Sequence, residues 1–137
     1  LKPGAASLLH ALGQAGVPCA VASSSRRDEI EHRLDRVGVL QHFHAWAGGN
    51  EVPRGKPDPA LYQLAAVRLG VDPAQCLAFE DSENGARAAQ AAGVAVVIVP
   101  DLKAPSIEVV ERSHGVLESL VHAHDHLPRW FRAAWVP

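Results

Sequence analysis

Three short stretches of this sequence combine hydroxyl, ammonium and carboxylate groups in a way that suits phosphate chemistry. They are VASSS at residues 21–25, RGKPDP at residues 54–59 and FEDSENG at residues 79–85. Hydroxyls and a lysine can bind phosphate oxygens, and adjacent carboxylates can hold a hard cation such as Mg²⁺ that offsets phosphate charge. If the three stretches meet in the fold, they form a phosphoryl-transfer site.

The serines follow an apolar run and precede a polar helical pattern at residues 26–39. Backbone N–H groups at a helix start attract anions, and a serine hydroxyl adds a hydrogen bond, so Ser23 is a candidate phosphate ligand. The alternative is that Ser25 only caps the helix, with Asp28 completing a capping box. The VASSS stretch by itself leaves both interpretations open.

Lys56 lies between Gly55 and Pro57. Because proline restricts the residue before it, we expect Lys56 in an extended loop conformation that can direct its ammonium into a site. The alternative is an ordinary exposed loop lysine.

Glu80 and Asp81 are adjacent acids at the end of an apolar run. Two such carboxylates repel each other and resist desolvation, which favours a bound cation, and Mg²⁺ prefers oxygen ligands. The alternative is that Asp81 or Ser82 caps the next helix. The combination of the three stretches favours Mg²⁺ between the acids and a phosphate.

The elements around these stretches repeat one order: a helix, a glycine that can end it, a short turn and an apolar strand. The glycines are Gly16, Gly70 and Gly93. Strands are predicted at residues 19–22, 76–79 and 95–99, with a weaker candidate at 45–47, and they are continuously apolar. This pattern predicts a doubly wound α/β sheet of mostly parallel strands with helices on both faces. Its ligands should bind at the carboxyl ends of the strands.

The pattern weakens after Pro100 into short helical pieces, which we expect to pack on a sheet edge through Ile107, Val110, Leu117, Leu120 and Val121. Leu127 and Pro128 are interpreted as a helix end. A zinc site is an alternative for the histidines at 122, 124 and 126, but structural zinc generally needs four ligands, so we expect none. The aromatic residues Trp130, Phe131 and Trp135 could bind a partner or fold back on the domain.

Composition excludes several classes of protein. The chain has 137 residues, 47% of them hydrophobic, and a formal net charge of −2, which fits one globular domain without the basic surface that nucleic acid requires. No apolar run reaches the roughly 20 residues of a membrane span, and no signal peptide is visible, so we expect a cytoplasmic protein. Cys19 and Cys76 are expected to be reduced core thiols.

The run of motifs resembles the haloacid dehalogenase-like hydrolase superfamily, in the branch of β-phosphoglucomutase and the phosphoglycolate phosphatases. The resemblance covers about residues 2–100 and is most specific in EDSENGARAAQAAG at residues 80–93. It implies a Rossmann-like core and Mg²⁺-dependent hydrolysis of a small phosphate monoester, such as a sugar phosphate, through an aspartyl phosphate. The alternatives are mutase-type transfer and a non-catalytic phosphate-binding or interaction module.

The resemblance also implies roles for individual residues. Ser23 is similar to the hydroxyl that binds the transferring phosphoryl group, with the backbone N–H of Ser24 beside it, and Lys56 to the lysine that neutralises that group. Glu80 and Asp81 are similar to the Mg²⁺ ligands, with Glu80 binding directly or through water. Ser25 and Arg26 match positions that contact a distal phosphate or the sugar.

One part of the family pattern is absent from these residues. The family places an aspartate nucleophile and an aspartate acid/base in a DxDGT-like motif on a central strand, and no Asp-x-Asp occurs in this sequence. We therefore expect residues 1–137 to be the C-terminal portion of a core domain lacking its central strand, with the motifs in 2–100 and a helical extension in 101–137. By itself this portion should be inactive.

Overall fold

A computed structural model describes residues 2–100 and 104–132 of the chain. Four of its strands follow helices in the order that the sequence predicts, and each lies within one residue of its predicted position. They are β1 (Ala20–Ser23), β2 (Ala45–Gly48), β3 (Leu77–Glu80) and β4 (Ala95–Ile98). The weaker strand candidate at residues 45–47 is thus confirmed.

Glycine ends the helices where the sequence predicts. Helices α1 (Ala5–Gln14), α3 (Ala60–Leu69) and α4 (Glu83–Ala91) are followed by Gly16, Gly70 and Gly93, whose φ angles are 74°, 70° and 79°. These left-handed conformations strain any residue with a Cβ atom, so glycine stops each helix and turns the chain toward the next strand.

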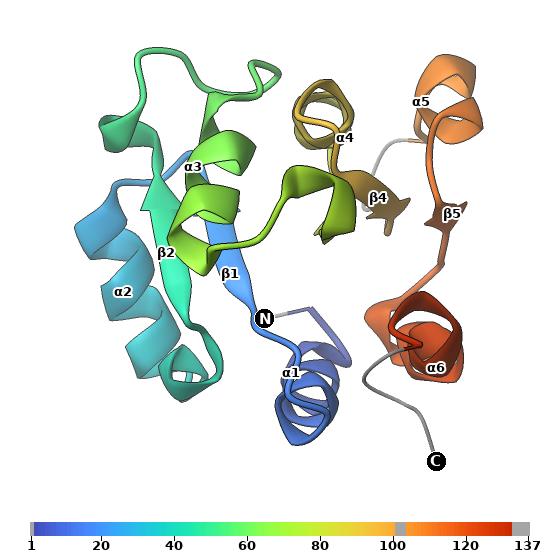
Figure 1. The fold of residues 1–137 in the computed structure, drawn as a ribbon, viewed down its shortest axis with the longest axis horizontal. Coiled ribbons are helices and arrows are strands. Elements are labelled where there is room, and N and C mark those ends of the chain that lie inside the picture. The colour runs from blue at the N-terminus through green and yellow to red at the C-terminus, as the bar shows by residue number, and fades with distance from the viewer. Residues whose placement is uncertain (1, 101–103, 133–137) are drawn as a thin grey trace.

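All described strand pairs are parallel, which confirms the α/β class. Strand β1 pairs with β2, while β3, β4 and the short β5 (Gly115–Val116), which we did not predict, form a second sheet. Helix α3 packs on β1 and β2, α4 packs on β3 and β4, and α2 (Arg27–Arg36) packs on β2 (Figure 1). Alanines on α4 are fully buried against β4, which lets helix and sheet approach closely.

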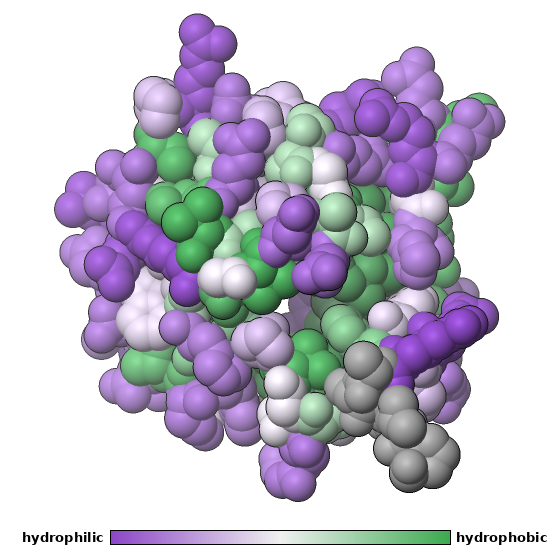
Figure 2. Space-filling view, in the orientation of Figure 1, coloured by the Kyte–Doolittle hydropathy of each residue, from purple (hydrophilic) through white to green (hydrophobic). Residues whose placement is uncertain are grey.

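A largely apolar groove of about 770 Å³ separates the two sheets. Its walls include Val21 of β1, Ala78 of β3 and Ala65 of α3. Among the described residues, β1 has no strand partner other than β2, and β3 none other than β4. The space-filling view shows apolar residues around a hollow in the middle of this face and hydrophilic residues around its periphery (Figure 2).

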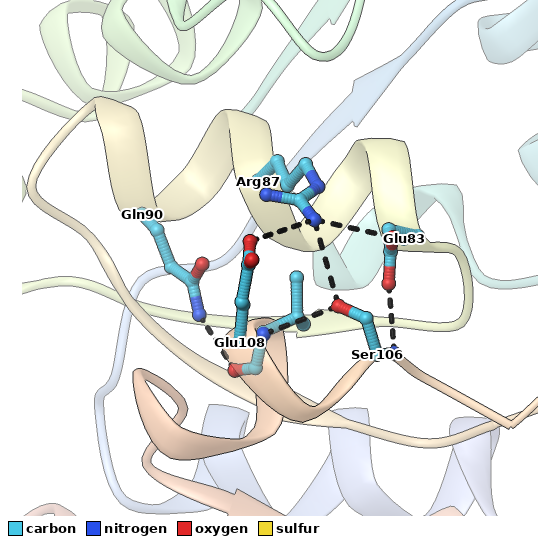
Figure 3. A network of polar contacts seen from close by, with 6 residues as sticks. Glu83, Arg87, Gln90, Ser106 and Glu108 are labelled. Carbon is cyan, nitrogen blue, oxygen red and sulfur yellow. Dashed lines mark hydrogen bonds and ion pairs between the residues drawn. The ribbon is translucent and has the colours of Figure 1, made fainter.

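The C-terminal extension packs through only some of the residues predicted. Leu117 and Leu120 pack on the cluster of buried leucines of α1, whereas Val121 is exposed. In α5 (Ile107–Glu111) the buried side chain is Val109, whereas Ile107 and Val110 are exposed, so the expectation that these two pack inward is wrong. The reason is a polar network that sets the rotation of α5 against α4 (Figure 3). Its contacts join Arg87 to Glu83, Ser106 and Glu108, and Gln90 to the Val109 carbonyl.

The 3₁₀ helix η4 (Leu120–His126) runs directly into α6 (Leu127–Trp130), so the predicted helix end at residues 127–128 is wrong. Pro128 lies in the first turn of α6, where the missing proline N–H costs no helical hydrogen bond. Trp130 and Phe131 pack on the α1 cluster of buried leucines, which favours folding back. Trp135 lies outside the described residues.

Two further expectations concern metal and thiol groups. In the part of the chain that the structure describes, no group of three or more His, Cys, Asp or Glu side chains is arranged to hold a metal ion. Both cysteines are free thiols, and burial raises the pKa of Cys19 to about 11. No helix among the described residues has the length and hydropathy to cross a bilayer.

Candidate active site

The carboxyl ends of β1 and β3 open into one cavity of about 460 Å³. Six of the predicted site residues line it: Ser23, Ser24, Ser25, Lys56, Glu80 and Asp81. Arg26 does not line this cavity, since its exposed guanidinium pairs with Asp28 at 3.2 Å. The structure therefore brings the serine, lysine and acidic stretches together and leaves Arg26 outside.

Lys56 bridges the two sheets at this end of the molecule. Its Nζ donates to the Ala22 carbonyl of β1 at 2.9 Å and to Glu80 Oε2 of β3 at 2.6 Å. The Lys56 side chain is only 13% exposed and that of Glu80 only 7%, so this is a buried, charge-assisted contact. The interpretation of Lys56 as an ordinary exposed lysine is excluded. The Lys56–Pro57 peptide bond is cis.

Tyr62 of α3 also contacts Glu80, and none of the three sequence motifs includes this residue. Its hydroxyl donates to Glu80 Oε2, and Lys56 Nζ lies 5.2 Å from the centre of its ring. Burial and the nearby Glu80 charge raise the pKa of Tyr62 far above its ordinary value, which keeps the phenol protonated as a donor. The available signal was that the only tyrosine of the chain follows the GKPDP stretch.

Gly85 makes room for the Glu80 carboxylate at the start of α4. A Cβ atom at Gly85 would lie 1.9 Å from Glu80 Oε1 and 2.3 Å from its Cδ. The glycine in the FEDSENG stretch is therefore required by the close packing of an acid from the preceding strand against the helix.

The serine loop is held by contacts other than a helix cap. The N-cap of α2 is Arg26, without a side-chain capping bond, and the Ser25 hydroxyl instead accepts from Arg33 of α2 at 3.2 Å. The alternative interpretation of Ser25 as the helix cap, with Asp28 completing a capping box, is therefore wrong. Ser23 Oγ accepts from the Ser25 N–H at 3.2 Å, so the loop turns back on itself at the cavity.

Two glycines at the end of β2 press against this loop. A Cβ at Gly48 would lie 2.4 Å from the Arg27 nitrogen, and one at Gly49 would lie 2.2 Å from the Ser24 carbonyl oxygen. The Gly49 N–H donates to the Ser25 carbonyl at 2.7 Å. The loop that carries the serines therefore takes its position from β2, through contacts that only glycine allows.

Asp81 does not cap the following helix. Ser82 does so, since its hydroxyl accepts from the Gly85 N–H at 3.0 Å, and this alternative for Ser82 is confirmed. The Asp81 side chain is 44% exposed along the cavity and lies 3.5 Å from Lys2 Nζ. Its carboxylate thus remains available to a ligand in the cavity.

The side chains of the cavity suit a divalent cation that takes few ligands from the protein and most of its ligands from water and phosphate. Asp81 offers hard carboxylate oxygens beside the serine hydroxyls, whereas Glu80 already accepts from Lys56 and Tyr62. Mg²⁺ commonly takes one or two carboxylates and completes its shell with water and phosphate oxygens. Asp81 is therefore the better placed direct ligand of the two, and Glu80 fits the water-mediated position.

Comparison with known proteins shows the family to which the chain belongs. The profile of the haloacid dehalogenase-like hydrolases matches residues 1–93, and the chain belongs to this family. It is 38% identical over 131 residues to the putative phosphatase YhcW of Bacillus subtilis, a match that covers 92% of this chain and 59% of YhcW.

Two solved structures place the chain within the family. A haloacid dehalogenase family hydrolase from Deinococcus radiodurans, solved with bound phosphate and sodium, has a TM-score of 0.83 and 32% identity over 98% of this chain. A putative β-phosphoglucomutase from Thermotoga maritima has a TM-score of 0.81 and 28% identity over 92% of this chain. The likeness supports the β-phosphoglucomutase and phosphoglycolate phosphatase branch. The chain spans 59–61% of the lengths of these three proteins.

Proposed function

We propose that the protein hydrolyses a small phosphate monoester, such as a sugar phosphate, with the help of Mg²⁺. The observation that carries the proposal is the meeting of a serine loop, the buried Lys56 and the accessible Asp81 along one cavity. Family membership and the phosphate bound in the Deinococcus relative support a phosphorylated substrate.

In this proposal the serine loop binds the phosphoryl group. The Ser23 hydroxyl and the Ser24 backbone N–H donate to its oxygens, and Ser25 contacts a more distant part of the substrate. Arg26 stays a candidate for the far end of a long substrate, since its side chain lies outside the cavity. Because Gly48 and Gly49 hold the loop, these donors need little reorganisation when phosphate binds.

Lys56 supplies a fixed positive charge beside the phosphoryl group. Glu80 and the Ala22 carbonyl each accept a bond from its ammonium, and an ammonium has three N–H donors, so one remains for a phosphate oxygen. Tyr62 supports this arrangement by holding the Glu80 carboxylate in place.

Asp81 would hold the Mg²⁺ ion directly, with Glu80 acting through water. When bound, the ion would neutralise charge between carboxylates and phosphate. The protein side chains bind and orient the ester and exclude water from the lysine side of the cavity.

The nucleophile of this reaction is proposed to come from outside these 137 residues, which contain no Asp-x-Asp. A carboxylate oxygen of an aspartate at the cavity mouth would attack the phosphorus atom and form an aspartyl phosphate, while the P–O bond to the substrate alcohol breaks and the second aspartate of the motif protonates the leaving oxygen. Water, deprotonated by that same aspartate, would then release inorganic phosphate and restore the nucleophile. The apolar groove is lined by residues of β1 and β3, and among the described residues neither strand has a partner on the side of the groove, which suits one further extended strand. Such a strand would end at the serine, lysine and acidic residues.

The experiment is a panel of phosphate esters tested with the full-length protein, with and without Mg²⁺. We expect release of inorganic phosphate that requires Mg²⁺, and Asp81→Asn should lower kcat/KM by on the order of 100-fold, the scale of losing one transition-state charge contact. Analysis of the products separates hydrolysis from mutase-type transfer, because a mutase returns an isomerised ester.

The matched control is Asp35→Asn, which removes the same charge from the exposed surface of α2. It should keep the activity of the unmodified protein. Equal activity in the Asp81→Asn and Asp35→Asn proteins would refute the proposed site, provided that circular dichroism shows both to be folded.

A further inference from the structure

Lys2 lies at the cavity although neither the motifs nor the resemblance pointed to it. Its Nζ is 3.5 Å from Asp81 Oδ2, and it lines the cavity together with the three serines and Lys56. The two side chains are 37% and 44% exposed, so the pair is in contact with solvent. The Lys2 ammonium thus contacts the Asp81 carboxylate, which is the proposed ligand of the metal ion.

The position of Lys2 is set by its backbone. Gly4 has a φ of 86°, and a Cβ there would lie 2.6 Å from the Val121 nitrogen, so this turn is packed tightly on η4. The Lys2 carbonyl also accepts from the Ala5 N–H at 3.1 Å, which joins it to the start of α1. Since the backbone on its C-terminal side is held this way, Lys2 reaches Asp81 from a fixed point.

Two ion pairs between described residues line the cavity. Lys56 pairs with Glu80 in the buried part, and Lys2 pairs with Asp81 at the exposed side. A divalent cation that binds Asp81 must displace the Lys2 ammonium or stay beside it against like-charge repulsion. Either way, part of the binding free energy of the cation is offset.

We propose that Lys2 competes with the divalent cation for Asp81 and so lowers the affinity of the site for the metal. This inference rests on the proposed function, because it needs Asp81 to be a metal ligand. It adds a residue that sets how much free Mg²⁺ the site requires.

The test is a calorimetric titration of the full-length protein with Mg²⁺ alone, at fixed ionic strength. Lys2→Gln should bind Mg²⁺ about two- to fivefold more tightly than the unmodified protein, the range expected from losing one exposed ion pair. Lys2→Arg keeps the positive charge and should bind Mg²⁺ like the unmodified protein. The difference should shrink at high salt, which screens exposed charges.

Two controls assign the result. Arg36→Gln removes the same charge from the far end of α2 and should leave Mg²⁺ affinity unchanged, so an equal gain there would overturn a local role for Lys2. Asp81→Asn should abolish the binding. If Mg²⁺ binding depends on Asp81 but Lys2→Gln binds Mg²⁺ no more tightly than the unmodified protein, the Lys2 proposal alone is overturned. If Asp81→Asn leaves Mg²⁺ binding unchanged, the proposed metal site is overturned as well.

Discussion

Replacement of Gly85 by alanine tests the packing at the centre of the site. Gly85 lies in the first turn of α4 and has no positive φ, so its backbone conformation suits alanine. In an exposed helix this change would stabilise the protein by about 1 kcal/mol. Here the new Cβ would lie 1.9 Å from Glu80 Oε1, well inside contact distance.

The expected loss in the free energy of unfolding follows from the hydrogen bonds that the Glu80 carboxylate would lose. Its carboxylate accepts from Lys56 and Tyr62, and both donors are at least largely buried. Leaving one buried donor without a partner costs about 1 to 3 kcal/mol. Loss of both contacts therefore outweighs the gain in helix propensity, and we expect Gly85→Ala to lower the free energy of unfolding by about 1 to 5 kcal/mol.

The assay is urea unfolding of the protein, with Gly13→Ala as the matched control. Gly13 lies within α1, has no positive φ, and a Cβ there would meet no atom within 4 Å. Gly13→Ala should therefore raise the free energy of unfolding by about 0.5 to 1 kcal/mol.

A double-mutant cycle shows whether Glu80 causes the loss. In a Glu80→Ala background the Gly85→Ala change meets no carboxylate and should be neutral or stabilising. The reasoning is refuted if Gly85→Ala stabilises the unmodified protein as much as Gly13→Ala does, or if its cost persists after Glu80 is removed.

Two further predictions concern the strand and loop that hold the serines. Gly49→Ala would place a Cβ 2.2 Å from the Ser24 carbonyl oxygen, and this overpacking should cost about 1 to 3 kcal/mol in urea unfolding and weaken inorganic phosphate binding in calorimetry; unchanged values for both would contradict the contact. The Arg68 hydrogen bond lowers the Glu51 pKa from 4.5 to about 2, so Glu51 stabilises the fold above pH 4.5 and loses this effect as the pH falls toward 2. Glu51→Gln should therefore destabilise the protein at pH 7 and lose most of this difference near pH 2, and a difference independent of pH would count against the ion pair.

Much of the local structure could be predicted because it depends on neighbouring residues. Continuous apolar runs located the strands, and Gly16, Gly70 and Gly93 ended the helices because only glycine adopts the left-handed conformation without strain. Ligands of α/β folds bind at the carboxyl ends of parallel strands, which is why residues as distant as Ser23 after β1 and Asp81 after β3 could be assigned to one site, although the two strands belong to different sheets.

The sequence could not predict contacts made across the fold. The donors to Glu80 come from a loop and a helix 24 and 18 residues away. A serine before a helix is usually a cap, but the Ser25 hydroxyl instead accepts a hydrogen bond from the guanidinium group of Arg33. The orientation of α5 depends on its polar contacts with α4, so the pattern of apolar residues alone predicted the wrong buried face.

By itself, therefore, the sequence determined the order of helices and strands, the parallel sheets and the residue types at the strand ends, because these follow from local conformational preference and apolar periodicity. The tertiary structure decided which charges pair. It placed Lys56 on Glu80 and Lys2 on Asp81, because pairing depends on distances between segments far apart in the chain. The buried carboxylate of Glu80 therefore positions Lys56, and the accessible carboxylate of Asp81 is the one that we propose as the ligand of the cation.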